Sequence, residues 1–253
     1  MRYVSRFFSI YLTRLILPTQ VTPNQVSLAM IVTGIVASIF FLFPFSFSFL
    51  IGALLLQLWY LIDCMDGEVA RYRHYQATGS VVISKHECKL TGGYFDIINH
   101  YIVNFLVPIT ISFGLFLLSG RLFFILLGIV GSLSQVLMLA MHDGRHRTIL
   151  TYLKKYRQVE MVPAKSSEEK VRKSLAHWAF IVLHYTVTYP TVMNLVLVAA
   201  VLNFVFPSIE WRSFLIIYLA GGSILVASAI ISRTIARQTI EEEVQTQFKM
   251  AGE

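Results

Sequence analysis

The chain has 253 residues, of which 56% are hydrophobic and only 14% are charged, and its mean hydropathy is +0.65. This composition excludes an ordinary soluble domain and is typical of an integral membrane protein. The net charge of +7 would suit nucleic acid, but the basic residues lie between apolar runs, as in the cytoplasmic loops of membrane proteins. We therefore expect membrane lipids, and no nucleic acid, among its partners.

The first residues of the chain predict a helix that lies on the membrane surface. Residues 1–18 mix three arginines with aromatic and aliphatic residues, a pattern typical of a short amphipathic interfacial helix. A signal peptide is the rival interpretation, but no unbroken apolar region with a cleavage site follows. Thr22, Pro23 and Gln25 then indicate a helix start, with Thr22 as N-cap and Gln25 closing a capping box.

Six apolar runs follow, and they predict an all-α integral membrane protein with six transmembrane helices in a single domain over residues 1–253. The runs cover about residues 23–43, 49–71, 92–118, 122–141, 176–206 and 214–231. The fifth run is long enough to bend, and Pro190 is the expected position. The transmembrane core is expected over residues 23–237. The chain after Arg233 is predicted to be a charged helix, with residues 238–253 as a cytoplasmic tail.

The distribution of positive charge predicts the orientation. With six spans and both termini inside, Arg121 and Arg212 are the only outer basic residues among 21 lysines and arginines. This asymmetry indicates that the side with the other basic residues faces the cytoplasm. We expect the membrane to be the inner or cell membrane of a bacterium or archaeon. The longest hydrophilic stretch, residues 142–173, includes Arg145 and Arg147. They are interpreted as contacts for anionic lipid headgroups or as an approach for an anionic substrate.

Three of the four aspartates lie at the ends of apolar runs. Asp63 and Asp66 are three residues apart and Asp96 and His100 four apart, so on helices each pair shares a face. Clustered carboxylates repel one another unless a cation lies among them, and oxygen-rich clusters suit Mg²⁺ or Mn²⁺. The pattern therefore predicts a divalent metal site.

Small residues and one arginine follow the first two aspartates. Gly67 and Ala70 would let a ligand approach the helix backbone, and Arg71 presents a planar fork of donors that suits phosphate. The two cysteines, Cys64 and Cys88, do not form a disulfide framework, and we expect free thiols in a reducing cytoplasm.

This stretch resembles the signature of the CDP-alcohol phosphotransferases, which runs Asp-x2-Asp-Gly-x2-Ala-Arg, roughly eight or nine residues, then Gly-x3-Asp-x3-Asp. The matching residues are Asp63, Asp66, Gly67, Ala70, Arg71, Gly92 and Asp96. Two departures separate the chain from the pattern. The gap between Arg71 and Gly92 holds 20 residues, and His100 stands where the family has its last aspartate, the proposed base.

The resemblance implies an enzyme that transfers a substituted phosphate group from a CDP-linked donor to a hydroxyl acceptor and releases CMP, in phospholipid or related glycolipid synthesis. One of the two substrates is a lipid, so the donor is CDP-diacylglycerol or a CDP-linked small alcohol. A homodimer and two ions of Mg²⁺ or Mn²⁺ are implied. The expected metal ligands are Asp63, Asp66, Asp96 and His100, and the expected nucleotide and phosphate contacts are Asn24, Gly67, Ala70, Arg71 and Gly92.

Several alternatives stay open at this point. His100 is interpreted as the general base, as a metal ligand or as a packing residue, since imidazole titrates near neutral pH and also binds metals. Residues 74–88, which join the two motif halves, are predicted to form a cytoplasmic flap over the site. A metal-dependent phospholipid or diphosphate hydrolase is the alternative function. A cation-coupled transporter is less favoured, because the carboxylates lie at span ends on one side.

Overall fold

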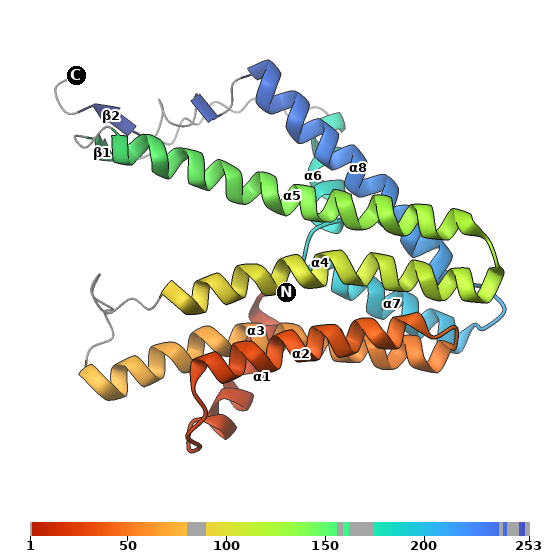
Figure 1. Ribbon diagram of the computed structural model, residues 1–253, viewed down its shortest axis with the longest axis horizontal. Helices are drawn as coiled ribbons and strands as arrows, with labels where there is room; N and C mark the ends of the chain where they lie inside the picture. Colours follow the sequence, from red (N-terminus) through yellow and green to blue (C-terminus); the bar gives the residue numbers. More distant parts are fainter. Residues whose placement is uncertain are drawn as a thin grey trace.

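The computed structural model describes residues 2–79, 90–155, 159–161, 175–237, 240–241 and 248–250. Long helices lie side by side and form most of the molecule (Figure 1). The helices are α1 (Arg2–Ile16), α2 (Pro23–Leu42), α3 (Ser46–Thr78), α4 (Leu90–Ser119), α5 (Leu122–Lys155), α6 (Leu175–Thr186), α7 (Thr191–Val205) and α8 (Trp211–Arg237). Two short strands, β1 (Val159–Met161) and β2 (Phe248–Met250), complete the described elements.

Among the described residues, five helices are long and apolar enough to cross a membrane, namely α2, α3, α4, α5 and α8. The pair α6 and α7 passes the same test together, with a bend of 70° between them. The six expected spans are therefore reached if this bent pair is one span, and its break includes Pro190, as predicted. The all-α membrane fold is confirmed.

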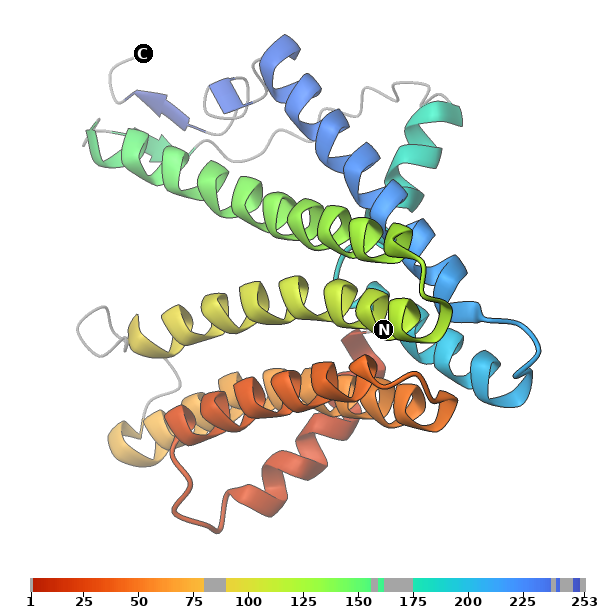
Figure 2. The same cartoon turned by 45° about the vertical axis from the view of Figure 1, so that its right-hand side comes forward.

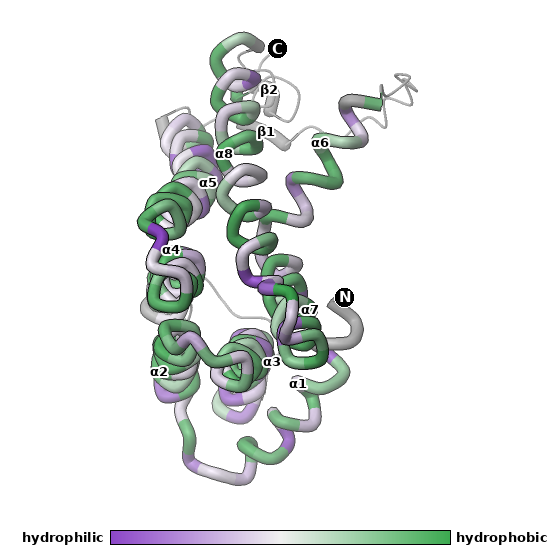
Figure 3. The backbone as a smooth tube through the Cα atoms, turned by 90° about the vertical axis from the view of Figure 1, so that its right-hand side faces the viewer, coloured by the Kyte–Doolittle hydropathy of each residue, from purple (hydrophilic) through white to green (hydrophobic). Residues whose placement is uncertain are grey.

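The outer surface of the bundle is apolar. Leu28, Leu126, Leu133 and Leu225 are exposed by 60%, 61%, 59% and 62%. Figure 3 shows hydrophobic residues along the long helices. Apolar surface of this extent would cause aggregation in water, whereas in a bilayer it contacts lipid chains.

The largest buried cluster lies between α2, α3, α4, α7 and α8. It includes Phe41, Phe49, Trp59 and Val103, all with no exposed surface. A Cβ atom at Gly34 would lie 2.6 Å from Cγ2 of Val103, closer than real Cβ contacts allow. Glycine at this position therefore lets α2 and α4 approach closely, which is how apolar helices gain packing energy in lipid.

The turns of the bundle alternate between its two ends. The short α2–α3, α4–α5 and α7–α8 connections lie at one end, on the right in Figures 1 and 2. The last residues of α3 and the first residues of α4 lie toward the opposite end. The two helices that carry the two motif halves therefore meet on the side away from these three short turns.

The start of α2 is formed as predicted. Oγ1 of Thr22 accepts a hydrogen bond from the Gln25 amide at 3.4 Å, and Oε1 of Gln25 accepts one from the Thr22 amide at 2.9 Å. Pro23 occupies the first helical position. The capping box fixes where the chain leaves α1 and enters the membrane span.

Two helices extend beyond their predicted ends. α3 continues to Thr78, so His74 is helical instead of lying in the predicted loop and flap. α5 continues to Lys155, so Arg145 and Arg147 belong to a helix, where the sequence predicted a hydrophilic loop. A cluster of charges ends a membrane span, but it does not end a helix when no proline interrupts it. Residues 80–89, with Cys88 and most of the predicted flap, lie outside the described residues.

The tail differs from its prediction as well. β2 pairs antiparallel with β1, with Val159 opposite Met250 and Met161 opposite Phe248. The prediction of a charged helix after Arg233 is therefore correct up to Arg237, where α8 ends, and for residues 240–241, which are helical, and it is wrong for β2. Strand pairing joins segments far apart in the chain, so the local composition of the tail could not indicate it.

Candidate metal and phosphate site

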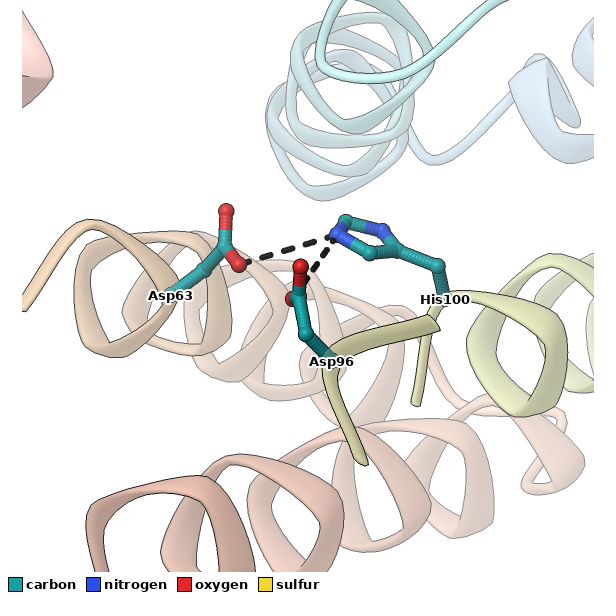
Figure 4. Close-up of side chains that lie close together, drawn as sticks. All are labelled: Asp63, Asp96 and His100. Atoms are coloured by element: carbon teal, nitrogen blue, oxygen red, sulfur yellow. Dashed lines mark ion pairs between the residues drawn. The ribbon is translucent and has the colours of Figure 1, made fainter. Parts of the chain in front are cut away.

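Three side chains of the two motif halves meet at one point. Figure 4 shows Asp63 of α3 and Asp96 and His100 of α4 pointing toward one another. Nε2 of His100 lies 3.4 Å from Oδ1 of Asp96 and 3.6 Å from Oδ1 of Asp63. One donor atom of each residue lies within 4.8 Å of the other two. The predicted convergence of the motif halves is thus present for these three residues.

The spacing of these atoms fits a divalent cation. Ligands bound at about 2.1 Å lie about 3.0 Å apart at right angles and about 3.4 Å apart at tetrahedral angles. The separations at His100 are near these values and exceed the usual N–H···O hydrogen-bond length of about 2.9 Å. Carboxylates suit Mg²⁺ and Mn²⁺, and imidazole suits transition metals. The donor set therefore fits the metal that the resemblance implies.

The three side chains are partly open to their surroundings. His100, Asp63 and Asp96 expose 27%, 21% and 45% of their side chains. Full burial of two carboxylates would carry a large desolvation cost, and full exposure would let water screen them. Intermediate exposure keeps the group accessible to an ion and to a substrate.

An aromatic residue supports the imidazole. The edge of Trp59 packs against the His100 ring, with centroids 5.3 Å apart and an interplanar angle of 88°. Trp59 has no exposed surface, and its Nε1 donates a hydrogen bond to Oδ1 of Asn99 at 3.2 Å. Sequence analysis missed Trp59 and Asn99. Trp59 precedes Asp63 by four residues, so its position on the same helix face was the available signal.

Asp66 lies outside the group of three. Its Oδ2 accepts a hydrogen bond of 2.6 Å from Oγ of Ser27, which belongs to α2 and is 2% exposed. Among the described residues, the group within mutual reach of one cation contains Asp63, Asp96 and His100, without Asp66. A metal-binding role for Asp66 stays a prediction. Ser27 was missed because a serine within an apolar run is usually a packing residue.

The predicted phosphate contacts lie on the same part of α3. A Cβ atom at Gly67 would lie 3.1 Å from Nη1 of Arg71, so the guanidinium lies beside the bare backbone of this glycine. Arg71 is exposed, and in the described part of the chain its guanidinium makes no hydrogen bond or ion pair. Its donors are therefore available to an anion.

The structure says less about the other three predicted nucleotide contacts, Ala70, Asn24 and Gly92. Ala70 is half-buried on α3, and Asn24 is exposed in the first turn of α2. Gly92 is half-buried near the start of α4, and a Cβ atom there would meet nothing within 4 Å. A nucleotide role for these three residues stays a prediction.

The fourth aspartate joins α4 to α5 beside the site. Oη of Tyr101, the residue after His100, donates a hydrogen bond of 3.1 Å to Oδ2 of Asp143. Arg145 and Arg147 lie two and four residues farther along α5, half-buried and exposed respectively. The helix that carries both arginines is thereby tied to the helix that carries His100. Sequence analysis did not use Asp143, although a lone carboxylate at the end of an apolar run was a visible signal.

Cys64, within the motif, is half-buried on α3, and its expected state as a thiol stays a prediction. Gly222 allows α8 to pack closely, since a Cβ atom there would lie 2.7 Å from Cγ1 of Val187. Gly221 takes no part in this approach, because a Cβ atom there would meet nothing within 4 Å.

Comparison with known families matches one part of the chain. The model of the CDP-alcohol phosphatidyltransferase family matches residues 20–79, which include all of α2 and α3 with Asp63, Asp66, Gly67 and Arg71. The match ends before α4. No curated protein matches the chain. The resemblance inferred from the signature is therefore confirmed, and residues 20–79 carry the CDP-alcohol phosphatidyltransferase sequence pattern.

Proposed function

We propose that the protein is a metal-dependent membrane enzyme that transfers a substituted phosphate group from a CDP-linked donor to a hydroxyl acceptor and releases CMP. One observation carries this proposal. Asp63, inside the family match, lies within metal-binding distance of Asp96 and His100, beyond the match. The proximity of Asp96 and His100, on the helix that follows the match, supports a metal site shared by the two motif halves.

The residues of α3 suit a diphosphate. Arg71 has uncommitted donors, and Gly67 leaves the backbone open beside them. In the proposed reaction these residues bind the donor diphosphate, while Asp63 and Asp96, with Asp66 or His100, hold the divalent ions. A bound ion would neutralise the diphosphate and stabilise the CMP leaving group.

The acceptor hydroxyl needs a base as it attacks the donor phosphorus. His100 stands where the signature has its last aspartate, and we propose that its imidazole takes this proton. Nε2 is the nitrogen that lies near both carboxylates. Because ligation and proton transfer at Nε2 use the same lone pair, the two roles exclude each other at that atom at any moment.

The substrates and surroundings follow from the membrane setting. One substrate is a lipid that reaches the site from the bilayer, and the site opens to the cytoplasm, where a CTP-derived donor is made. Arg145 and Arg147 attract the anionic substrate, and the enzyme works as a homodimer in phospholipid or glycolipid synthesis. The charge asymmetry supports the orientation, and the family resemblance supports the dimer.

The test is CMP release by the purified protein. CDP-diacylglycerol and CDP-linked small alcohols are each offered with a panel of polar and lipid alcohols, in Mg²⁺, in Mn²⁺ and in excess EDTA. We expect CMP only when metal, donor and a matching acceptor are all present. Full turnover in EDTA would contradict the metal site. Phosphate products formed without an acceptor would indicate the hydrolase alternative.

A further inference from the structure

The helix α1 turns polar side chains, as well as apolar ones, toward the protein. Ser9 and Thr13, four residues apart on one face, are only 0% and 6% exposed. Their hydroxyls donate to the two oxygens of one carboxylate, Glu68 of α3, at 2.8 Å from Ser9 and 2.6 Å from Thr13. Both oxygens of Glu68 are therefore held by α1.

Glu68 lies between Gly67 and Arg71, the residues of α3 that are proposed to bind the donor diphosphate. It follows Gly67 directly and precedes Arg71 by three residues, a spacing at which opposite charges on a helix attract each other. In the described part of the chain, Glu68 makes no ion pair with Arg71 and bonds to α1 instead. The guanidinium of Arg71 lies beside Gly67.

The hydroxyls of Ser9 and Thr13 thus determine which residue the Glu68 carboxylate contacts. A carboxylate with both oxygens hydrogen-bonded has a fixed position, and charge-assisted bonds from hydroxyls are among the stronger ones. Without them, Glu68 is free to turn toward Arg71, where it would compete with an incoming phosphate and repel its charge. Ser9 and Thr13 prevent this competition.

We propose that Ser9 and Thr13 of α1 hold the Glu68 carboxylate away from Arg71, so that the guanidinium stays available to the donor diphosphate. The three residues are positioning residues, since they act through Arg71. The inference rests on the proposed function, because it names what determines donor affinity at the same site.

CDP binding in the presence of Mg²⁺, measured by titration calorimetry on purified protein, tests this proposal without turnover. Four variants are compared with the native protein: Ser9→Ala/Thr13→Val, the same pair with Glu68→Gln, Glu68→Gln alone, and Thr33→Val. Thr33 is a half-buried residue of α2 whose hydroxyl donates to the backbone oxygen of Ala29 in its own helix, at 2.7 Å. Thr33→Val is therefore the matched control for loss of a threonine hydroxyl.

In Ser9→Ala/Thr13→Val, the freed Glu68 carboxylate should weaken CDP binding by about two- to fivefold. A change of this size corresponds to the free energy of an exposed ion pair. Adding Glu68→Gln should restore native affinity, because a neutral amide does not neutralise Arg71. Glu68→Gln alone should bind CDP at least as tightly as the native protein, and Thr33→Val should match it.

The rescue separates this mechanism from simple loss of packing between α1 and α3. If the triple variant binds CDP as weakly as the double variant, the charge of Glu68 is not the cause and the proposal is overturned. Weaker binding by Glu68→Gln alone overturns it too, even if the double variant fails to fold. Absence of CDP binding by the native protein would remove the proposed function itself, an outcome distinct from a failed rescue.

Discussion

The two ends of the bundle differ in how their charged side chains are paired. At the end with the short turns, Arg212 is 1% exposed, and its guanidinium donates to both oxygens of Glu210, at 2.6 Å and 2.9 Å. It also donates to the backbone oxygens of Phe43 and Pro44, at 3.4 Å and 3.0 Å. At the other end, Asp63, Asp96 and His100 approach one another without hydrogen bonds of normal length.

The difference distinguishes a structural group from a functional one. Around Arg212 each charge has a partner of opposite sign, and the result ties the α2–α3 turn to the start of α8. Such a group needs nothing from outside. At the other end, two carboxylates converge on one imidazole, a donor set that suits a divalent cation, and the Arg71 guanidinium makes no hydrogen bond or ion pair in the described part of the chain. This end is therefore where ligands are expected.

The largest effect should follow from loss of a carboxylate in the group of Asp63, Asp96 and His100. Asp63→Asn or Asp96→Asn should lower CMP release by several orders of magnitude, because metal stabilisation of the reacting phosphate is worth several kcal/mol. Asp143→Asn is the matched control, since Asp143 bonds to Tyr101 outside the group of three. Native turnover in either of the first two variants, measured at saturating Mg²⁺, would refute the metal site.

The next effect concerns the imidazole. His100→Ala should lower turnover by about 10²–10⁴-fold, the usual contribution of a general base, while CDP affinity stays near native. His100→Asp, which restores the family residue, should retain more activity than alanine. Mn²⁺ binding, followed by electron paramagnetic resonance, separates the two roles. Normal Mn²⁺ affinity in His100→Ala would indicate a base, and a large loss of affinity would indicate a ligand.

Variants at the end that contains Arg212 should change the stability of the fold and leave the rate of the reaction unchanged. Arg212→Ala leaves Glu210 without its partner and removes donors from Phe43 and Pro44, so it should destabilise the fold by about 3–5 kcal/mol. Arg121→Ala, an exposed arginine of the same end, should change stability little. Thermal unfolding in detergent measures both. Turnover per folded molecule should stay native in each, and a stable Arg212→Ala would show that the network contributes little.

The sequence predicted features that depend on neighbouring residues in the chain. The spans follow from hydropathy, the start of α2 from Thr22 and Gln25, and the meeting of Asp63 with Asp96 and His100 from motif spacing. Each depends on a local pattern or on a signature with fixed spacing. These patterns decide most of the fold and the centre of the site.

Contacts between distant polar residues could not be predicted in this way. Ser27 and Asp66 are 39 residues apart, and Ser9 and Glu68 are 59 apart. A serine inside an apolar run has the same local pattern whether it bonds to its own helix or to a carboxylate of another helix. Which helices are neighbours decides between the two, and hydropathy contains no such information.

The smallest predicted effect tests one of these distant contacts. Ser27→Ala removes the hydroxyl that fixes Asp66 at 2.6 Å, and a hydrogen bond to a charged group is worth about 1.5–3 kcal/mol. We expect turnover to fall about tenfold, since Asp66 keeps its charge but loses its orientation. Ser38→Ala is the matched control, because in the described part of the chain the hydroxyl of this buried serine of α2 bonds to Gly34 of its own helix, at 2.9 Å, and to no other helix. Equal CMP release by both variants would exclude Ser27 from the site, whereas a selective loss in Ser27→Ala would extend the site to α2.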